Sequence, residues 1–190
     1  MEDIIENKII EKEDWSGKKL ALLEVSNCKF NSCNFTETDF VGTKFIDCIF
    51  KECNFSNSKI LNCSFCNVIF KECKISGVAF SEINKFLLAW EFDNCVIKLC
   101  NFSKLDIRKS KFTECLVHDT DFVDSDLNES DFSNSDLRGS KFQNSNLCKV
   151  NFVGAINYFI DPTINKITKA KFSLPEAISL LAGFDITISG

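Results

Sequence analysis

The sequence has few of the residues on which most catalytic and metal sites depend. Its 190 residues include one His, one Tyr, two Pro and seven Gly. A single histidine, His118, leaves little for acid–base or metal chemistry, and no phosphate-binding loop of the GxxxxGK type occurs. We therefore expect no enzyme activity, no catalytic residues, no metal and no cofactor.

Long apolar runs and an excess of positive charge are also missing. No run approaches the roughly 18 consecutive apolar residues of a membrane span, and 27 acidic against 22 basic residues give a net charge of -5. The charge argues against direct binding of nucleic acid. The first twenty residues lack the apolar core of a signal peptide. We expect a cytoplasmic protein whose 11 Cys are reduced thiols rather than disulfides.

What the sequence does have is a period of five residues. An apolar residue, here called a centre, recurs 25 times, and 16 of the 20 Phe are centres. The first series is Val25, Phe30, Phe35, Phe40, Phe45, Phe50, Phe55, Ile60, Phe65, Phe70, Ile75 and Phe80. After a slip of two residues, the second is Phe92, Ile97, Phe102, Ile107, Phe112, Val117, Phe122, Leu127, Phe132, Leu137, Phe142, Leu147 and Phe152.

A second pattern lies two residues before each centre, at a position called the slot. Nine of the 11 Cys occupy slots, and Ser or Thr fills most of the others. Cys33, Cys53 and Cys73 lie twenty residues apart, so we expect them to stack on one side of the molecule. Buried Cys behaves as a small apolar residue, so the slots are interpreted as packing positions rather than as metal ligands.

A period of five fits neither regular secondary structure. Five residues turn about 500° on an α-helix, and on a strand an odd period sends successive centres to opposite faces. The chain must therefore turn a corner at each repeat to keep every centre inside. A coil with one short side per repeat does so, and successive coils stack at about 4.8 Å per layer.

Segments such as SNCKF, DSDLNESDFSNSDLRGSKF and NSNLCKVNF resemble the pentapeptide repeat family over residues 23–154. The resemblance implies an all-β fold, a right-handed quadrilateral β-helix with four repeats per coil. With a short C-terminal α-helix, this is the fold class that we predict. Residues 23–154 correspond to about six coils, or a rod of roughly 30 Å at ~4.8 Å per coil.

The segments outside the repeats are predicted to close the two ends. Residues 1–22 are interpreted as a cap or a first coil, with Ile4, Ile5, Ile9 and Ile10 covering the open end. In residues 155–190, Ser173–Glu176 has the pattern of a capping box that starts a helix ending near Gly183. The apolar side chains of this segment either cap the last coil or form a twofold dimer contact. The family resemblance favours the dimer contact. Its residues would be Leu174, Ile178, Leu181, Phe184, Ile186 and Ile188.

The repeat is interrupted at residues 81–91, SEINKFLLAWE, which are two residues longer than two repeats require. One interpretation is a bulged coil whose apolar side chains pack inside. The other is a projecting loop that presents Phe86 or Trp90 to a partner.

Negative charge is concentrated between residues 112 and 137. This acidic band has eight acids and no Lys or Arg: Glu114, Asp119, Asp121, Asp124, Asp126, Glu129, Asp131 and Asp136. Asp106 and Asp126 lie twenty residues apart and are expected to stack on one face. An Asp before the centre is part of the family pattern and explains four of the eight. Alternatively, the band imitates part of a DNA duplex, which carries one charge per ~1.7 Å.

The opening MEDIIENKII, the phase slip and the apolar C-terminal segment resemble the topoisomerase-protecting subgroup of Qnr, MfpA and McbG, with a layout nearest to the microcin immunity protein. This resemblance implies a homodimer that binds DNA gyrase or topoisomerase IV and protects it from a toxin or a quinolone-type poison. The alternative is a scaffold or adaptor unrelated to topoisomerases, because a fold alone does not define a function.

Overall fold

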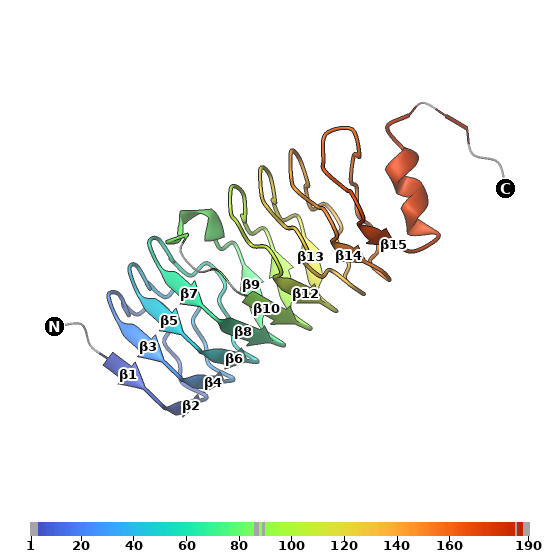
Figure 1. Cartoon of the computed structure of the whole chain (residues 1–190). Coiled ribbons are helices and arrows are strands. Elements are labelled where there is room, and N and C mark those ends of the chain that lie inside the picture. Colours follow the sequence, from blue (N-terminus) through green and yellow to red (C-terminus); the bar gives the residue numbers. More distant parts are fainter. Residues whose placement is uncertain (1–3, 86–87, 89, 185, 188–190) are drawn as a thin grey trace.

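The computed structural model describes residues 4–85, 88, 90–184 and 186–187. The chain winds into a parallel β-solenoid of about eight coils, and the two termini lie at opposite ends of the rod (Figure 1). Its short strands are β1 (Ile4–Glu6), β2 (Ile9–Glu11), β3 (Glu24–Ser26), β4 (Lys29–Asn31), β5 (Lys44–Ile46), β6 (Ile49–Lys51), β7 (Ser64–Cys66), β8 (Val68–Lys71), β9 (Lys74–Ser76), β10 (Trp90–Asp93), β11 (Val96–Lys98), β12 (Lys111–Thr113), β13 (Leu116–His118), β14 (Asn151–Phe152) and β15 (Lys171–Phe172).

The register of the ladders confirms four repeats per coil. Phe30 pairs with Phe50, and Phe50 pairs with Phe70, so each step along the rod takes twenty residues. Across the interruption the step becomes 22 residues, since Phe70 pairs with Phe92. The phase slip in the sequence is therefore a two-residue insertion that leaves the stacking intact on this side of the rod.

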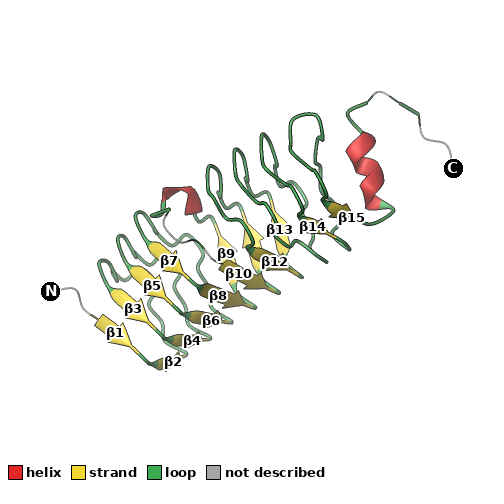
Figure 2. Cartoon of the chain, viewed as in Figure 1, coloured by secondary structure: helices red, strands yellow, loops and turns green. Residues whose placement is uncertain are grey.

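The ladders form separate sheets on the sides of the rod. In the described residues the strand orders are β1-β3-β5-β7, β12-β10-β8-β6-β4-β2, β13-β11-β9 and β14-β15. Figure 2 shows most strands in the N-terminal coils and mainly turns and loops in the C-terminal ones. The later coils still stack in register through single bridges such as Asp121↔Lys141 and Asp126↔Asn146.

At every centre from Val25 to Phe152 except Phe80, the residue two positions later has a positive φ. Asn57 (φ 56°), Asp119 (φ 51°) and Gly139 (φ 71°) are examples. Asn, Asp and Gly adopt this left-handed conformation most readily. The turn is closed by a backbone hydrogen bond, as from Thr38 N to Phe35 O at 3.1 Å. The sequence therefore bends once per repeat and keeps every centre inside.

We expect Gly139→Ala to lower stability by about 1–2 kcal/mol from backbone strain alone. Gly139 has φ 71°, and an added Cβ would also collide with the Asp119 carboxylate of the neighbouring coil. Urea unfolding measures the change. Gly17→Ala is the matched control, because it has a similar φ of 66° but nothing within 4 Å of the added Cβ. Equal losses at the two positions would contradict the contribution of the collision.

The core consists of aromatic columns that run along the rod. Phe112 stacks on Phe92 at 4.8 Å and on Phe132 at 4.7 Å between ring centroids. Across the interior it meets Phe122 edge-to-face at 5.6 Å and 89°. Both geometries are the favourable ones for aromatic pairs. The period of five therefore produces one continuous core without any long secondary-structure element.

The slots are buried and carry hydrogen bonds between coils. Thr38 Oγ1 donates to Trp15 O at 2.8 Å, Ser135 Oγ donates to Phe112 O at 2.6 Å, and Cys48 Sγ donates to Val25 O at 3.4 Å. A slot residue must therefore be small and must also satisfy a buried carbonyl where it can. This explains why Cys, Ser and Thr alternate there.

The solenoid continues beyond residues 23–154 in both directions. At the N-terminal end, β1 and β2 pair with β3 and β4, so residues 4–22 form a first coil. At the other end, Phe172 stacks on Phe152 at 5.2 Å. These added coils explain why the rod has about eight coils rather than the six expected. At ~4.8 Å per coil its length is roughly 38 Å.

Two expectations about the ends are wrong in detail. Ile5 and Ile10 pack against the core, but Ile4 and Ile9 are 61% and 68% exposed because they alternate to the outside of the strands. The C-terminal helix, η2 (Glu176–Leu181), is a 3₁₀ helix preceded by Pro175 and has no side-chain cap. Ser173 Oγ instead accepts a hydrogen bond from Gly154 N at 2.9 Å, so no capping box forms.

The only other helix in the described part of the chain is η1 (Phe80–Glu82), a 3₁₀ turn at the start of the interruption. Among the described residues, none of the helices is long and apolar enough to cross a membrane.

Candidate partner-binding surfaces

The acidic band surrounds the rod instead of forming one face. Asp121, Asp126, Asp131 and Asp136 pair with Asn101, Asp106, Lys111 and Leu116 of the preceding coil, which belong to four different ladders. One coil of twenty residues passes all four sides, so the 26-residue band passes each side about once. A partner that approaches from one side therefore meets only part of the band.

Three of the four Asp residues before the centres have a local structural role. Asp126 Oδ1 accepts a hydrogen bond from Asn128 N at 3.0 Å, and Asp131 Oδ1 accepts one from Ser133 N at 2.8 Å. These are Asx turns, in which a carboxylate replaces a backbone acceptor at a bend. The same oxygens also accept from Asn146 and Asn151 of the next coil, each at 3.0 Å. Asp136 Oδ1 accepts in the same way from Arg138 N at 3.1 Å. Turn formation therefore explains Asp126, Asp131 and Asp136 without a partner.

The other four acids stand at corners. Glu114, Asp119, Asp124 and Glu129 have φ of 55°, 51°, 57° and 62°. The family pattern, with Asp before the centre, does not account for these four acids. They occupy the left-handed backbone position, which Asp tolerates better than most residues. In the sequence these corner positions can be found by their spacing, because each lies two residues after a centre. Three acids of the band therefore close turns, and four stand at corners with positive φ, beside the functional interpretation.

Asp106 and Asp126 stack as expected, since their backbones are bridge partners. Arg108 offsets the repulsion between them, because Nε and Nη2 donate to the two Asp106 oxygens at 2.7 Å each. This hydrogen-bonded guanidinium lowers the pKa of Asp106 below its ordinary value. The pair is therefore a stabilised stack rather than a site of strained charge.

Asp136 is an enclosed acid of the band, with 12% of its side chain exposed. His118 Nε2 lies 3.1 Å from Asp136 Oδ2, and Asn157 Nδ2 donates to Oδ1 at 2.9 Å. Burial raises the pKa of Asp136, but the hydrogen bonds from Asn157 and His118 outweigh burial and leave the pKa lowered. The single His of the chain thus joins neighbouring coils through its contact with Asp136.

The interruption does not present Trp90 to a partner. Trp90 is 3% exposed and occupies a slot, where its Nε1 donates to Phe65 O at 3.1 Å. It therefore replaces the thiol or hydroxyl that other slots use, and Ile83 is buried beside it in the same core. The bulged-coil interpretation is correct for these two side chains. Phe86, the other predicted contact, lies outside the described residues.

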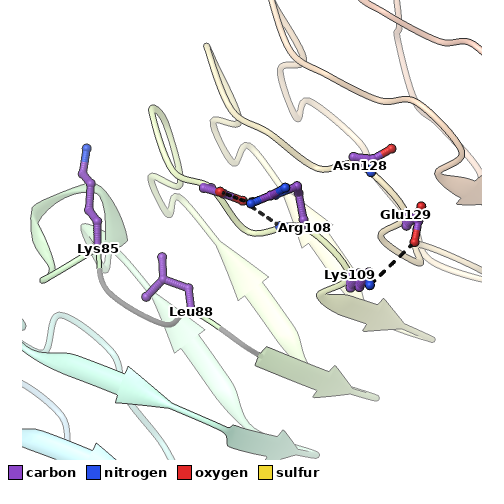
Figure 3. Close-up of a pocket in the computed structure, with 7 residues that line it drawn as sticks. Lys85, Leu88, Arg108, Lys109, Asn128 and Glu129 are labelled. Atoms are coloured by element: carbon purple, nitrogen blue, oxygen red, sulfur yellow. Dashed lines mark hydrogen bonds and ion pairs between the residues drawn. The ribbon is translucent and has the colours of Figure 1, made fainter.

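A hollow of about 610 Å³ lies beside the interruption. Figure 3 shows Leu88 and Lys85 on one side of it and Arg108 and Lys109 on the other. Arg108 is held by Asp106, and Lys109 Nζ lies 4.0 Å from Glu129 Oε2. The surface at the interruption is therefore a shallow polar hollow whose charges are largely paired.

The C-terminal segment exposes the apolar side chains that were predicted for dimerisation. Leu174 is 78% exposed, and the others of this set that the structure describes are exposed as well: Ile178, Leu181, Phe184 and Ile186. Ile188 lies outside the described residues. Among the residues of η2, none is buried. The segment thus offers an apolar surface at the end of the rod.

The cysteines are mostly packed inside the solenoid. All 11 are free thiols, and nine of them are buried in slots. Burial raises the pKa of Cys63 to about 12, so the thiol form predominates. Cys63 and Cys66 are three residues apart, but Cys63 Sγ points inward to Phe40 O at 2.9 Å while Cys66 is partly exposed. Among the residues described, no group of three His, Cys, Asp or Glu side chains could hold a metal ion.

The fold and its surfaces define a non-globular solenoid of five-residue repeats. A family model for the pentapeptide repeat region matches residues 23–86 and 83–152. The chain belongs to the pentapeptide repeat family.

Solved structures of the same repeat type resemble this chain to different degrees. A trypsin-treated variant of QnrB1, a plasmid-mediated fluoroquinolone resistance protein, is 20% identical, with a TM-score of 0.58, and the match covers 100% of this chain and 99% of that one. Full-length QnrB1 is 17% identical over 96% of this chain and 100% of that chain, with a TM-score of 0.49. HetL from the cyanobacterium Nostoc is 11% identical over 87% and 84%, with a TM-score of 0.45. No curated protein sequence matches this chain.

Proposed function

We propose that this protein binds a type II DNA topoisomerase, DNA gyrase or topoisomerase IV, and protects it from a toxin or quinolone-type poison in the cytoplasm. The observation that carries the proposal is the end-to-end correspondence with the fold of QnrB1, a resistance protein, which covers 100% of this chain and 99% of that one. The acidic band adds support through its charge, because a negatively charged rod is attracted to a surface built to hold DNA.

Binding would involve one side of the rod. On the side of Asp126 and Glu129, a partner meets two acids of the band, Lys149 Nζ lies 2.7 Å from Glu129 Oε1, and Asp131 is on the adjacent side. Such a contact imitates DNA only locally, since a duplex carries charge along its whole length. Charge then speeds encounter and orients the rod, while uncharged contacts supply most of the affinity.

The direct test is gyrase supercoiling with and without a gyrase poison. We expect the protein to restore supercoiling and to reduce the number of trapped double-strand breaks. Topoisomerase IV relaxation is measured in parallel to distinguish the two enzymes. Inhibition without rescue would replace protection with competition for the DNA site, and no effect on either enzyme would favour a scaffold or adaptor.

The charge of the band is tested by Asp126→Asn with Asp131→Asn. Asn keeps the oxygen that accepts the hydrogen bonds from Asn128 N and Ser133 N, so the turns are retained while two charges are removed. We expect a severalfold loss of gyrase affinity that shrinks at high salt. Asp14→Asn with Asp39→Asn is the matched control outside the band, since both form the same turn. Equal losses in the two variants would contradict a specific role of the band.

We also propose that the exposed C-terminal segment forms a twofold homodimer. Ile178 and Leu181 are 44% and 42% exposed on η2, and covering them would bury apolar surface at the end of the rod. Ile178→Asp with Leu181→Asp is expected to halve the mass measured by light scattering, with unchanged circular dichroism. A wild-type chain that is monomeric across the concentration range would show that the segment only caps the last coil.

A further inference from the structure

The N-terminal end of the solenoid exposes the edge of its first coil, residues 4–22 (Figure 1). In later coils the carbonyl before each centre accepts a hydrogen bond from the coil that precedes it. Asn34 O accepts from Trp15 N at 2.8 Å, and Asn54 O accepts from Phe35 N at 2.7 Å. Asp14 holds the equivalent position in the first coil. In the described part of the chain no coil precedes it, and such a β-edge is a template for pairing with another chain.

The interior of this end is apolar and only partly covered. Ile5, Ile10, Trp15 and Leu20 are the four centres of the first coil, and all are partly buried against the core. Trp15 contacts the ring of Phe35 at 5.2 Å, so the aromatic column reaches the first coil of the rod. A second rod end of the same shape could bury these four side chains.

The slots of the first coil differ from those of the coils that follow. Lys8, Glu13 and Lys18 stand two residues before Ile10, Trp15 and Leu20, and all three are exposed. From Cys28 onward the slots are buried and hold no charged residue in the described chain. A stacked coil would enclose the three charges, and burying an unpaired charge is costly. Charged side chains at such positions prevent edge-to-edge association in other β-proteins.

Lys18 also occupies the edge itself. Its Nζ donates to Asp14 O at 2.7 Å. This carbonyl is the acceptor that the N–H of a preceding coil would use, as the pairing of Asn34 O with Trp15 N shows one coil further on. The ammonium group therefore satisfies a backbone acceptor and keeps a charge at the point where another coil would dock.

We propose that Lys8, Glu13 and Lys18 form a charged end-stop that prevents a second copy of this chain from stacking on the N-terminal end. The second copy is the partner that the edge fits, since coils of this chain already stack on one another by the same backbone bonds. Two N-terminal ends related by a twofold axis would pair their edges antiparallel and join the two apolar interiors. The charges in the slots would then face each other in a closed interface.

The test removes the three charges with Lys8→Ser, Glu13→Ser and Lys18→Ser in the full chain. Serine is native to many slots of this solenoid, so the coil is retained. With the C-terminal contact intact, both ends of each dimer can pair, and we expect rods joined end to end whose mass rises with concentration. In the Ile178→Asp, Leu181→Asp background only the N-terminal ends can pair, and we expect the mass from light scattering to double, with rods of twice the length in electron micrographs. The matched control is Glu6→Ser, Lys12→Asn and Lys19→Ser, which removes the same charges from exposed positions outside the slots of the same coil. It is expected to keep the parental mass.

Both sets are also made in the Ile178→Asp, Leu181→Asp background, so the result does not depend on the C-terminal contact. A folded slot variant that keeps the parental mass would overturn the end-stop, as would equal association of the control. If the triple variant does not fold, Lys18→Met is measured in its place. It leaves Asp14 O available and is expected to give a mass that rises with concentration, and a constant mass would overturn the proposal.

Discussion

Replacement of Phe112 by Ala is expected to destabilise the protein by about 3–5 kcal/mol, because it leaves a cavity in a close-packed aromatic column. Phe112 is fully buried and contacts four rings, those of Phe92, Phe102, Phe122 and Phe132. The solenoid has no second core that could compensate. Urea unfolding followed by circular dichroism measures the loss.

Phe159→Ala is the control for this experiment, because Phe159 is an exposed Phe on the same rod. Its replacement is expected to change stability by less than about 0.5 kcal/mol, as for ordinary surface positions. Similar losses for the two variants would contradict the column as the source of stability.

Trp90→Ala is expected to cost a similar amount, about 3–5 kcal/mol, for a different reason. The indole fills the interior next to Phe65, Phe80, Phe92 and Phe102 at the point where two extra residues interrupt the repeat. Its loss removes both ring contacts and the hydrogen bond to Phe65 O. Thermal and urea unfolding are the measurements.

Trp90→Phe separates the two contributions. It keeps an aromatic ring but leaves Phe65 O without the indole N–H, which we expect to cost about 1–3 kcal/mol. If instead Trp90 were a partner contact, Trp90→Ala would weaken topoisomerase binding and leave the unfolding curve unchanged. That result would contradict the packing role.

The sequence predicted the core and the stacking because both depend on a strict period. Every centre from Phe92 to Phe152 is buried, and the predicted stack of Asp106 on Asp126 follows from a step of twenty residues. Prediction was weaker where the period breaks. Ile167 and Phe172 keep the phase of five with Phe152 and mark a further coil, but the irregular residues between them and Phe152 concealed this signal.

Trp90 could not be assigned from the pattern, because an indole is far larger than the other slot residues. It packs among the rings of Phe65, Phe80, Phe92 and Phe102, an arrangement that only the three-dimensional core shows. The acidic band is visible in the sequence itself, whereas its distribution around four sides follows from the coil geometry. The structural reasons for its corner acids required the observed φ angles.

The twenty-residue register also relates the length of the rod directly to the length of the sequence. Phe30, Phe50 and Phe70 are successive partners in one β-ladder. A duplication or deletion of twenty residues would therefore restore every corner, slot and ring contact in the neighbouring coils. It would move the C-terminal surface along the axis by about 4.8 Å without rotating it. A change of five residues would instead turn that surface by one side of the square. Whole coils therefore change the length of the rod, and single repeats change the direction in which its C-terminal surface faces.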